Sequence, residues 1–333
     1  MKVKLTQLKS LLKTILSSKY YSNSEAQDIA EVLMHAEMTG KNTQGVLKLI
    51  ATPSLQDIKP EHKPKVIKST KVSVLIDGGG NPGILVSKMA IKSVIDKCKK
   101  NGFAIVGTKN TFSSTGVIGY YAGEIAKNDF VGIVMAGSPG SVAPFGGIDP
   151  LFGTNPMAFG FPTNNWPIIF DAATSAITWY GLVRAKALGQ KIPEGVAIDK
   201  EGNITTDPEK AMQGAILPFD KGYKSSGLSM VIELLTGPLV EAMYPGSKNG
   251  GWGNLFIAID PELLTTREKF KEGSTLLIKT LKKSRKAKGQ DIIHIPGWKG
   301  LDRKEKIEKA GEMEVEDSLY KELKALSTKP TTS

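Results

Sequence analysis

One polar stretch, 39-TGKNTQGVLKL-49, carries side chains that could bind a small anionic substrate and act on it. Thr43 and Gln44 can hydrogen-bond a substrate oxygen, and Lys48 can pair with a carboxylate. Glutamine cannot give up a proton, and a lysine does so near neutral pH only where burial or neighbouring cations lower its pKa. The stretch therefore has the polarity of an active-site rim but no histidine-type proton donor.

A loop at 150-PLFGTNPMAFGFP-162 offers a second set of polar groups. Asn155 precedes Pro156, which favours extended backbone at Asn155 and predicts that its amide points outward. We therefore expect Thr154 and Asn155 to offer hydrogen bonds from a rigid loop.

Two further segments could hold an anion. In 170-FDAATSA-176, either Asp171 caps the following segment or Thr174 and Ser175 hold a ligand phosphate or amide. At 224-KSS-226, the start of a long predicted helix combines free backbone N–H groups with two hydroxyls and a lysine, although the serines could serve only as caps. By contrast, 77-DGGGNPG-83 lacks the G-x-G-x-x-G spacing of a dinucleotide fingerprint, and we expect a plain turn there.

The elements that must position these groups follow from the hydrophobic pattern. Residues 24–38 have a Ser/Glu start and apolar side chains at helical spacing, which predicts a helix that stops at Gly40 and leads into 39–49. From residue 71 onward, strands and helices alternate, which predicts an α/β layer. The expected strands are 71–78, 103–110, 130–138 and 255–260, and the expected helices are 84–102, 119–129 and about 225–243, then a basic helix and a terminal helix. Residues 59–70 are predicted to form an exposed connector with a solvated His62, and 144–176 to be loop-rich.

The bulk composition limits the classes of function. With 40% hydrophobic and 23% charged residues, no apolar run long enough to cross a bilayer and an N-terminus too charged for a signal peptide, we expect a cytoplasmic protein that does not insert into membranes. The net charge of +11 could indicate nucleic-acid binding, but the densest basic run, 279-KTLKKSRKAKG-289, contains no aromatic residue, so we expect no nucleic-acid partner. A positive field would instead attract anionic substrates and cofactors. Cys98 and the scattered His35, His62 and His294 predict no metal site.

The order of motifs along the chain resembles the malate/L-lactate dehydrogenase family that lacks a Rossmann domain. That family includes ureidoglycolate and sulfolactate dehydrogenases, diketogulonate reductase and a reductase of cyclic imino acids. The segments that carry the resemblance are PFGGIDPLFGTNPMAFGFP, IIFDAATSA, KSSGLSMVIELLTGPL and WGNLFIAID, and they occur in the right order across essentially the whole chain.

The resemblance implies a non-Rossmann α/β fold in which helices flank a mixed sheet, usually in a homodimer. It suggests a helical region of residues 1–70 plus 300–333 for substrate binding and dimerisation, and an α/β region of residues 71–299 for the cofactor. The cofactor would be NAD or NADP. Its implied contacts are Thr154, Asn155, Asp171, Ala173, Thr174, Ser175, Lys224, Ser225 and Gly297.

The resemblance also assigns roles at the opening stretch. Where the family has Ser-His-Gly and then an arginine, this chain has Thr43, Gln44 and Lys48, which would contact the substrate. Ser114 occupies the segment in which a second family histidine usually lies. The implied catalytic residues are Gln44, Lys48, Ser114 and Tyr120, and both usual histidines are absent. The side chains that could replace the histidines as proton donors are Lys48, Tyr120, Tyr121, Tyr223 and Lys224.

Three functions follow from this pattern. The first is NAD(P)H-dependent interconversion of a small 2-oxo and 2-hydroxy carboxylate. The second is reduction of a cyclic imino acid of the pyrroline- or piperideine-2-carboxylate type, because an iminium substrate already carries its proton. The third is a catalytically silent binding protein on the same fold.

Overall fold

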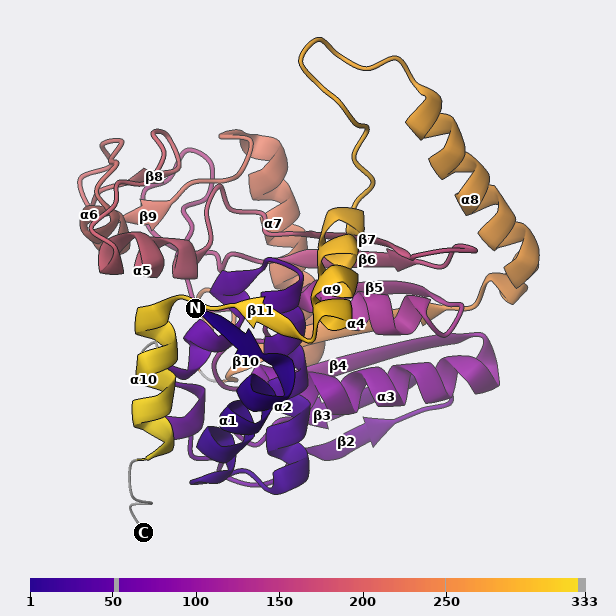
Figure 1. Cartoon of the computed structure of the whole chain (residues 1–333), viewed down its shortest axis with the longest axis horizontal. Helices are drawn as coiled ribbons and strands as arrows, with labels where there is room; N and C mark the ends of the chain where they lie inside the picture. The colour runs from indigo at the N-terminus through magenta and orange to yellow at the C-terminus, as the bar shows by residue number, and fades with distance from the viewer. Residues whose placement is uncertain (51–53, 249, 329–333) are drawn as a thin grey trace.

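The centre of the molecule is a seven-stranded sheet with the strand order β2-β3-β4-β10-β5-β6-β7 (Figure 1). β3 and β4 run parallel, and the other neighbours are antiparallel. The computed structural model describes residues 1–50, 54–248 and 250–328. It confirms the α/β prediction, with a mixed sheet flanked by helices. The strands are β2 (Lys65–Ser69), β3 (Ser73–Asp77), β4 (Phe103–Thr111), β5 (Val131–Ala136), β6 (Met157–Phe161), β7 (Ile168–Ala172) and β10 (Trp252–Ile259).

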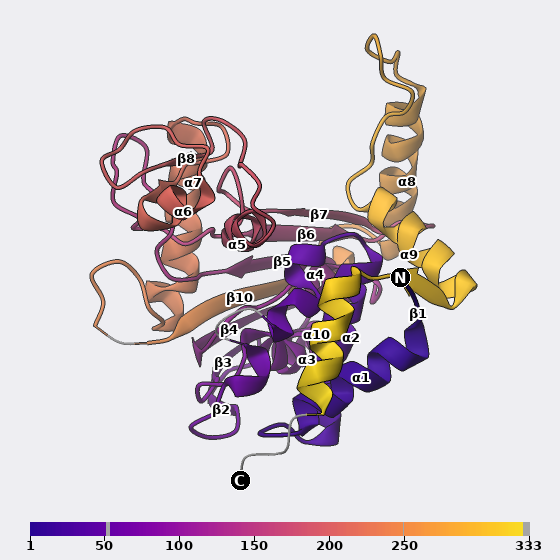
Figure 2. The ribbon, with the colours of Figure 1, turned by 60° about the vertical axis from the view of Figure 1, so that its left-hand side comes forward.

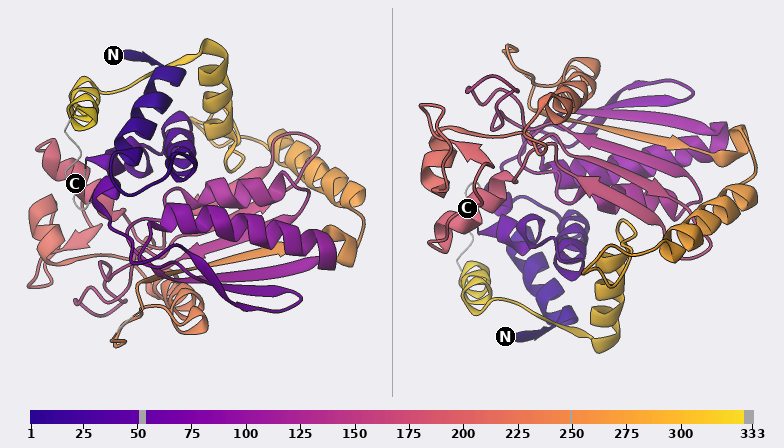
Figure 3. Two further views of the ribbon diagram at one scale, coloured as in Figure 1. Left: turned by 90° about the horizontal axis from the view of Figure 1, so that it is seen from below. Right: turned by 90° about the horizontal axis from the view of Figure 1, so that it is seen from above.

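Alternating side chains give this sheet one fully buried face and one partly covered face. In β3 and β5 every second side chain is buried, as expected for strands with one face against a core. Helices α3 (Gly83–Asn101) and α4 (Ile118–Ala126) pack on that face, and α7 (Tyr223–Thr236) packs on the other (Figure 3). Because α3 connects the parallel pair β3 and β4, this part of the sheet is a βαβ unit.

A layer of helices covers α3 and α4. Its central member is α2 (Asn23–Met38), which starts one residue before the predicted Ser24, with a capping box between Ser22 and Glu25. Around it lie α1 (Leu5–Ser17), α9 (Trp298–Ala310) and α10 (Asp317–Ser327). The short strands β1 (Lys2–Lys4) and β11 (Glu312–Glu314) pair antiparallel and join the early and late parts of this layer. The proposed division of the chain stays a prediction, and its residues 329–333 lie outside the described ranges.

A third group of elements stands beside one end of the sheet (Figure 2). It contains α5 (Trp179–Ala187), α6 (Pro208–Gln213) and the paired strands β8 (Ala197–Ile198) and β9 (Ala215–Ile216). These elements enclose a small hydrophobic core separate from the main one. Its buried members are Val142, Leu182, Ile192, Ala197, Ala211 and Ile216.

Three sequence predictions are wrong in detail. The connector 59–70 contains β2, an edge strand that the sequence pattern does not reveal because all its side chains are exposed. His62, expected to be solvated, is half-buried beside Asp77. The loop-rich segment 144–176 contains β6 and β7, which glycines and prolines obscure. The long helix ends at Thr236 because Pro238 cannot continue it.

The late part of the chain also differs from expectation. The basic helix is α8 (Arg267–Lys283), which projects from the body together with the segment that follows it (Figure 1). The expected terminal helix is two helices, α9 and α10, because Gly311 adopts a positive φ of 70° and β11 intervenes. Among the described residues, no helix is both long and apolar enough to span a bilayer.

Candidate functional site

The buried carboxylate of Glu37 fixes the loop that carries Gln44 and Lys48. Its two oxygens accept hydrogen bonds from the backbone N–H of Val46 (2.9 Å) and the side-chain amide of Asn42 (2.6 Å). A Cβ atom at Gly45 would overlap this carboxylate, so the glycine allows the close approach. Burial raises the pKa of Glu37, and the two donors oppose that rise. The last turn of α2 therefore sets the position of the short 3-10 helices η1 (Asn42–Gln44) and η2 (Val46–Leu49).

The structure brings Gln44 and Ser114 together. The Ser114 hydroxyl lies 3.4 Å from the Gln44 side-chain oxygen and also accepts a hydrogen bond from the Gly116 N–H at 3.0 Å. Ser114 follows β4 in a turn where Ser113 has a φ of 61°. Two neutral hydrogen-bonding groups from segments 70 residues apart thus face the same space.

Lys48 is an ionisable side chain inside the protein. It is only 1% exposed, and burial lowers its pKa well below the ordinary value. Within the described ranges its Nζ makes no hydrogen bond or ion pair, and it lies 3.1 Å from the ring centroid of Tyr180. Tyr180 comes from α5, so the contact joins η2 to the third group of elements.

These groups surround a cavity of about 380 Å³, the size of a small-molecule site. Thr43, Gln44, Lys48 and Ser114 line it together with three of the cofactor residues predicted from sequence, Thr154, Asp171 and Ala173. The same cavity is also lined by Lys41, Thr178, Trp179 and Tyr180. No histidine lines this cavity among the described residues.

Asp171 lies between this cavity and a larger one. Its carboxylate accepts a hydrogen bond from the Gly119 N–H (3.1 Å) at the start of α4, and its backbone oxygen lies 3.4 Å from the Lys41 ammonium. Asp171 therefore caps α4 rather than the segment after it, which corrects the local prediction. Burial raises the pKa of Asp171, while Lys41 and the Gly119 N–H act in the opposite direction.

The larger cavity, about 1220 Å³, shares Lys41, Val117 and Asp171 with the smaller one. Gly297 lies on its wall with a φ of 84°, and a Cβ there would meet the backbone oxygen of Ile169 at 2.8 Å. His35 is here, its pKa lowered to about 3 mainly by burial, so its ring is neutral. Basic side chains on the lining are Lys2, Lys41, Lys299, Arg303 and Lys306. Acidic side chains line it too, namely Asp171, Asp302, Glu312 and Glu314, and Lys2 and Lys306 pair with Glu312 and Asp302. Lys299 and Arg303 have no ion pair among the described residues, so a space of this volume with two such cations suits the size and charge of a dinucleotide.

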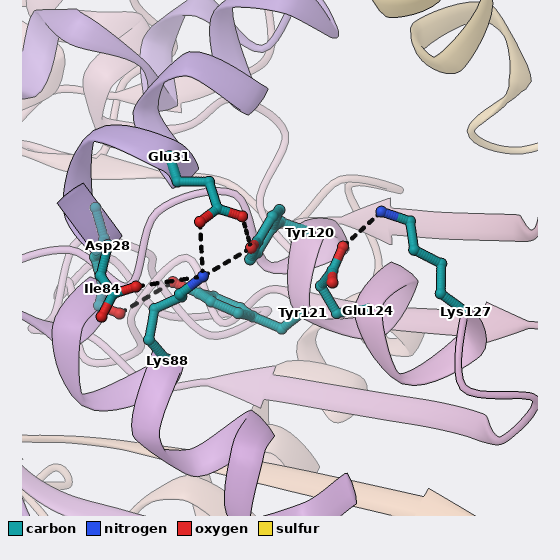
Figure 4. Close-up of polar contacts among 8 residues, drawn as sticks. All are labelled: Asp28, Glu31, Ile84, Lys88, Tyr120, Tyr121, Glu124 and Lys127. Atoms are coloured by element: carbon teal, nitrogen blue, oxygen red, sulfur yellow. Dashed lines mark hydrogen bonds and ion pairs between the residues drawn. The ribbon is translucent and has the colours of Figure 1, made fainter. Parts of the chain in front are cut away.

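Tyr120 does not line the smaller cavity, although the sequence suggested it as a proton donor. Its hydroxyl donates to Glu31 (2.6 Å) and accepts from Lys88 (3.0 Å), and Lys88 also pairs with Asp28 (Figure 4). Burial, reinforced by Glu31, raises the pKa of Tyr120 well above its ordinary value. These contacts tie α2 to α3 and α4, so Tyr120 holds helices together.

The alternative donors named with Tyr120 have different surroundings. Tyr121 is fully buried and donates to the Thr115 backbone oxygen at 2.8 Å. Tyr223 and Lys224 are exposed at the start of α7, and neither lines the two cavities.

The prediction for the Asn155 side chain is wrong. Asn155 adopts a φ of 37° instead of an extended conformation and is fully buried. Its amide donates inward to Glu233 (2.6 Å) and to the Ser229 backbone oxygen (3.0 Å). Asparagine tolerates positive φ, and acceptors on α7 outweigh the preference imposed by Pro156.

The remaining predicted cofactor residues bond to protein atoms. Thr174 donates to the backbone oxygens of Thr154 and Asn155, Ser175 donates to that of Ile177 at 2.8 Å, and Ser225 donates to Asp220. Their proposed cofactor contacts stay predictions. The turn at 77–83 is a plain turn, because Asp77 accepts from the Gly79 N–H and His62 fills the space above Gly79.

Sequence reasoning missed three residues that shape the smaller cavity. Trp179 and Tyr180 come shortly after the predicted FDAATSA segment, separated from it by Ile177 and Thr178, and an aromatic pair at that place was a usable signal. Glu37 gave a weaker signal, since an acidic residue at a helix end is more often a solvated charge.

Comparisons with known proteins give one consistent result. The family model described as malate/L-lactate dehydrogenase matches residues 3–324. The malate/(S)-sulfolactate dehydrogenase of Methanothermus fervidus is 35% identical over 331 residues, covering 96% of this chain and 95% of that protein. The Delta(1)-pyrroline-2-carboxylate/Delta(1)-piperideine-2-carboxylate reductase of Pseudomonas putida is 29% identical over 332 residues, covering 96% and 95%. The solved structure of sulfolactate dehydrogenase from Methanocaldococcus jannaschii has a TM-score of 0.84 at 32% identity, covering 98% of this chain and 96% of that one.

The Glu37 contacts predict a local stability effect. Glu37→Ala should lower the free energy of unfolding by about 1–3 kcal/mol, because the Val46 N–H and the Asn42 amide lose their acceptor. Urea denaturation measures this change. Glu37→Gln is the matched control: it keeps the volume and one acceptor and should lose less. Equal stability of Glu37→Ala and the unchanged protein would show that this carboxylate does not hold the loop.

Proposed function

Because the chain belongs to the malate/L-lactate dehydrogenase family, whose members are NAD(P)-dependent dehydrogenases, we propose that it transfers a hydride between a nicotinamide dinucleotide and a small 2-oxo or 2-hydroxy carboxylate. The observation that carries the proposal is the buried amine of Lys48. It faces a small cavity and has no carboxylate partner among the described residues. An enclosed cation without a counter-charge favours binding of an anionic substrate.

The larger cavity is the proposed cofactor site. Gly297 packs its backbone against Ile169 on the cavity wall, and Lys299 and Arg303, which have no ion pair among the described residues, would attract the cofactor's phosphates. Asp171 and Lys41, shared by both cavities, would lie where cofactor and substrate meet. The bound nicotinamide dinucleotide supplies or accepts the hydride. The proposed cofactor is NAD or NADP.

The smaller cavity supports a division of labour among three side chains. Lys48 pairs with the substrate carboxylate, while the Gln44 amide and the Ser114 hydroxyl hydrogen-bond the 2-oxo oxygen. That oxygen becomes an alkoxide and needs a proton. Lys48 is the proposed donor, because burial lowers its pKa toward the range in which a lysine can transfer a proton.

A cyclic imino acid is the second candidate substrate, and a specific observation favours it. Gln44 and Ser114 offer hydrogen bonds without an acidic proton, and the described lining of this cavity contains no histidine. An iminium carries its own proton and becomes a neutral amine when hydride adds. The likeness to the Pseudomonas putida reductase supports the same class.

The first prediction concerns substrates. With NADH or NADPH, the purified protein should reduce at least one member of a panel that contains pyruvate, oxaloacetate and five- and six-membered cyclic imino acids. The measurement is the loss of absorbance of the reduced nicotinamide. Comparable or faster rates on keto acids would exclude an imine preference. Cofactor binding measured by calorimetry, without turnover of any compound, would instead support the silent binding protein.

The second prediction separates anchoring from proton transfer at Lys48. Lys48→Arg keeps the charge but cannot release a proton, so kcat on a keto acid should fall by roughly 10²–10⁴-fold with little change in KM. Reduction of an imino acid should keep its kcat in the same variant. Lys48→Met should raise KM for both classes, and Lys68→Arg on the exposed strand β2 is the control. An unchanged kcat on keto acids in Lys48→Arg would remove Lys48 from the role of donor.

The third prediction concerns the proposed homodimer, for which α7 offers an interface outside the region of residues 1–70 plus 300–333 that the resemblance suggests. One face of α7 exposes apolar side chains at helical spacing, which indicates a protein-binding surface. The stripe consists of Tyr223, Met230, Val231 and Leu234, exposed by 69%, 54%, 48% and 51%. Met230→Glu with Leu234→Glu should convert a dimer into a monomer in sedimentation velocity. Leu264→Glu is the control, because this side chain is 92% exposed outside α7 and its change should leave the dimer intact. A dimer that survives the double change on α7 would mean that the interface lies on another surface.

A further inference from the structure

The position of Tyr180 gives its ring a specific relation to the substrate anchor. The Lys48 Nζ lies 3.1 Å from the ring centroid, within the distance at which an aromatic face attracts a cation. Tyr180 is in the first turn of α5, where the Thr178 side chain accepts a hydrogen bond from the Gly181 N–H. Leu182 of the same helix is buried in the small core beside the sheet, so the ring is held by an independently packed element.

The surroundings of Lys48 leave few other groups to stabilise its charge. Glu37 on α2 is engaged by Val46 and Asn42, Asp57 on η3 (Leu55–Asp57) pairs with Lys19, and Arg184 on α5 pairs with Glu316. The other ionisable groups on the cavity wall are Lys41 and Asp171, which lie beside each other. Asp171 is occupied by Lys41 and the Gly119 N–H, and the lowered pKa of Lys48 has burial as its cause.

We propose that the Tyr180 ring is the resident partner of the Lys48 ammonium, keeping it charged and directed into the cavity until a substrate carboxylate arrives. Tyr180 is then a positioning residue that acts through Lys48. Its hydroxyl takes no part, because the contact is with the face of the ring. The claim that Lys48 then binds a substrate carboxylate rests on the proposed function, whereas the effect of the ring on the charge of Lys48 does not.

The sign of the pH effect follows from the charge of Lys48. A carboxylate binds the protonated lysine, so affinity is greatest below the pKa of Lys48 and is lost as pH rises through it. Burial lowers that pKa, and the ring opposes the fall by favouring the charged form. Removing the ring should therefore lower the pKa further and weaken carboxylate binding at a given pH.

The direct test titrates Lys48 in the ligand-free protein. Lysine labelled with ¹³C at Cε gives one NMR signal per side chain, and the Lys48 signal is identified by its loss in Lys48→Arg. Tyr180→Leu should lower the Lys48 pKa by about 0.4–1.5 units, the size of a desolvated cation–π contact. Tyr180→Phe keeps the ring and should leave the pKa unchanged. Tyr180→Met serves if the leucine variant does not fold, and Trp179→Leu controls for the loss of a neighbouring aromatic side chain.

Kinetics test the claim that Lys48, positioned by the Tyr180 ring, binds the substrate carboxylate. In Tyr180→Leu the KM for the carboxylate substrate should rise about 5–30-fold at neutral pH, with a smaller change in kcat, and the fall of kcat/KM at high pH should begin at a lower pH. Adding Lys48→Arg to that variant should remove the shift, because arginine stays charged.

Two outcomes would overturn the inference. A Lys48 pKa that stays constant or rises in Tyr180→Leu would mean that the ring only excludes water. A large loss of kcat in Tyr180→Phe would mean that the hydroxyl is the active part. If no substrate is turned over at all, the proposed function fails, and the NMR titration still decides the role of the ring.

Discussion

A charge enclosed by protein needs a compensating partner, and the Lys48 ammonium imposes this constraint on the site. The lysine lies in a short 3-10 helix with little structure of its own, so its position depends on Glu37 at the end of α2. The opposite wall depends on α5, which is anchored in a different core. The cavity thus exists because two separately packed parts of the chain meet around one cation.

The polar contacts between helices serve the same arrangement. Glu31, Lys88 and Tyr120 fix α2 against α3 and α4, and α2 in turn presents the loop that contains Gln44 (Figure 4). A shift of α2 would move that loop relative to Ser114, which belongs to the turn after β4. Rigid support several residues away is therefore part of the geometry of the site.

Local sequence patterns predicted most of the regular elements. The helix at 24–38 and the strand–helix–strand unit around α3 depend on spacing and caps within a few residues, and they agree with the structure. Strands β2, β6 and β7 were not predicted, because exposure at the sheet edge and the presence of glycine and proline hide the alternation of apolar and polar side chains. Nothing local predicts that β10 inserts between β4 and β5, since sheet order depends on contacts between distant segments.

The site shows the same limit. The resemblance identified Gln44, Lys48 and Ser114, which face one cavity, because family motifs carry information about distant contacts. It could not identify the partners that this chain supplies. Asn155 turned inward because acceptors on α7 lie within reach, and Tyr120 was satisfied by α2 and α3. The sequence gives no sign that Tyr180 differs from other aromatic residues, because its contact with the Lys48 amine depends on where α5 packs.

The late insertion of β10 has a consequence for how the chain reaches this fold. β4 and β5 flank β10 on both sides, yet both are synthesised long before it. Until residues 252–259 emerge, the two halves of the sheet keep facing edges with unpaired N–H and C=O groups. Pairing at such large sequence separation is slow, and open edges favour association with other chains. Folding of this protein should therefore be limited by a single late strand that closes the sheet, and partial chains that end before it should aggregate.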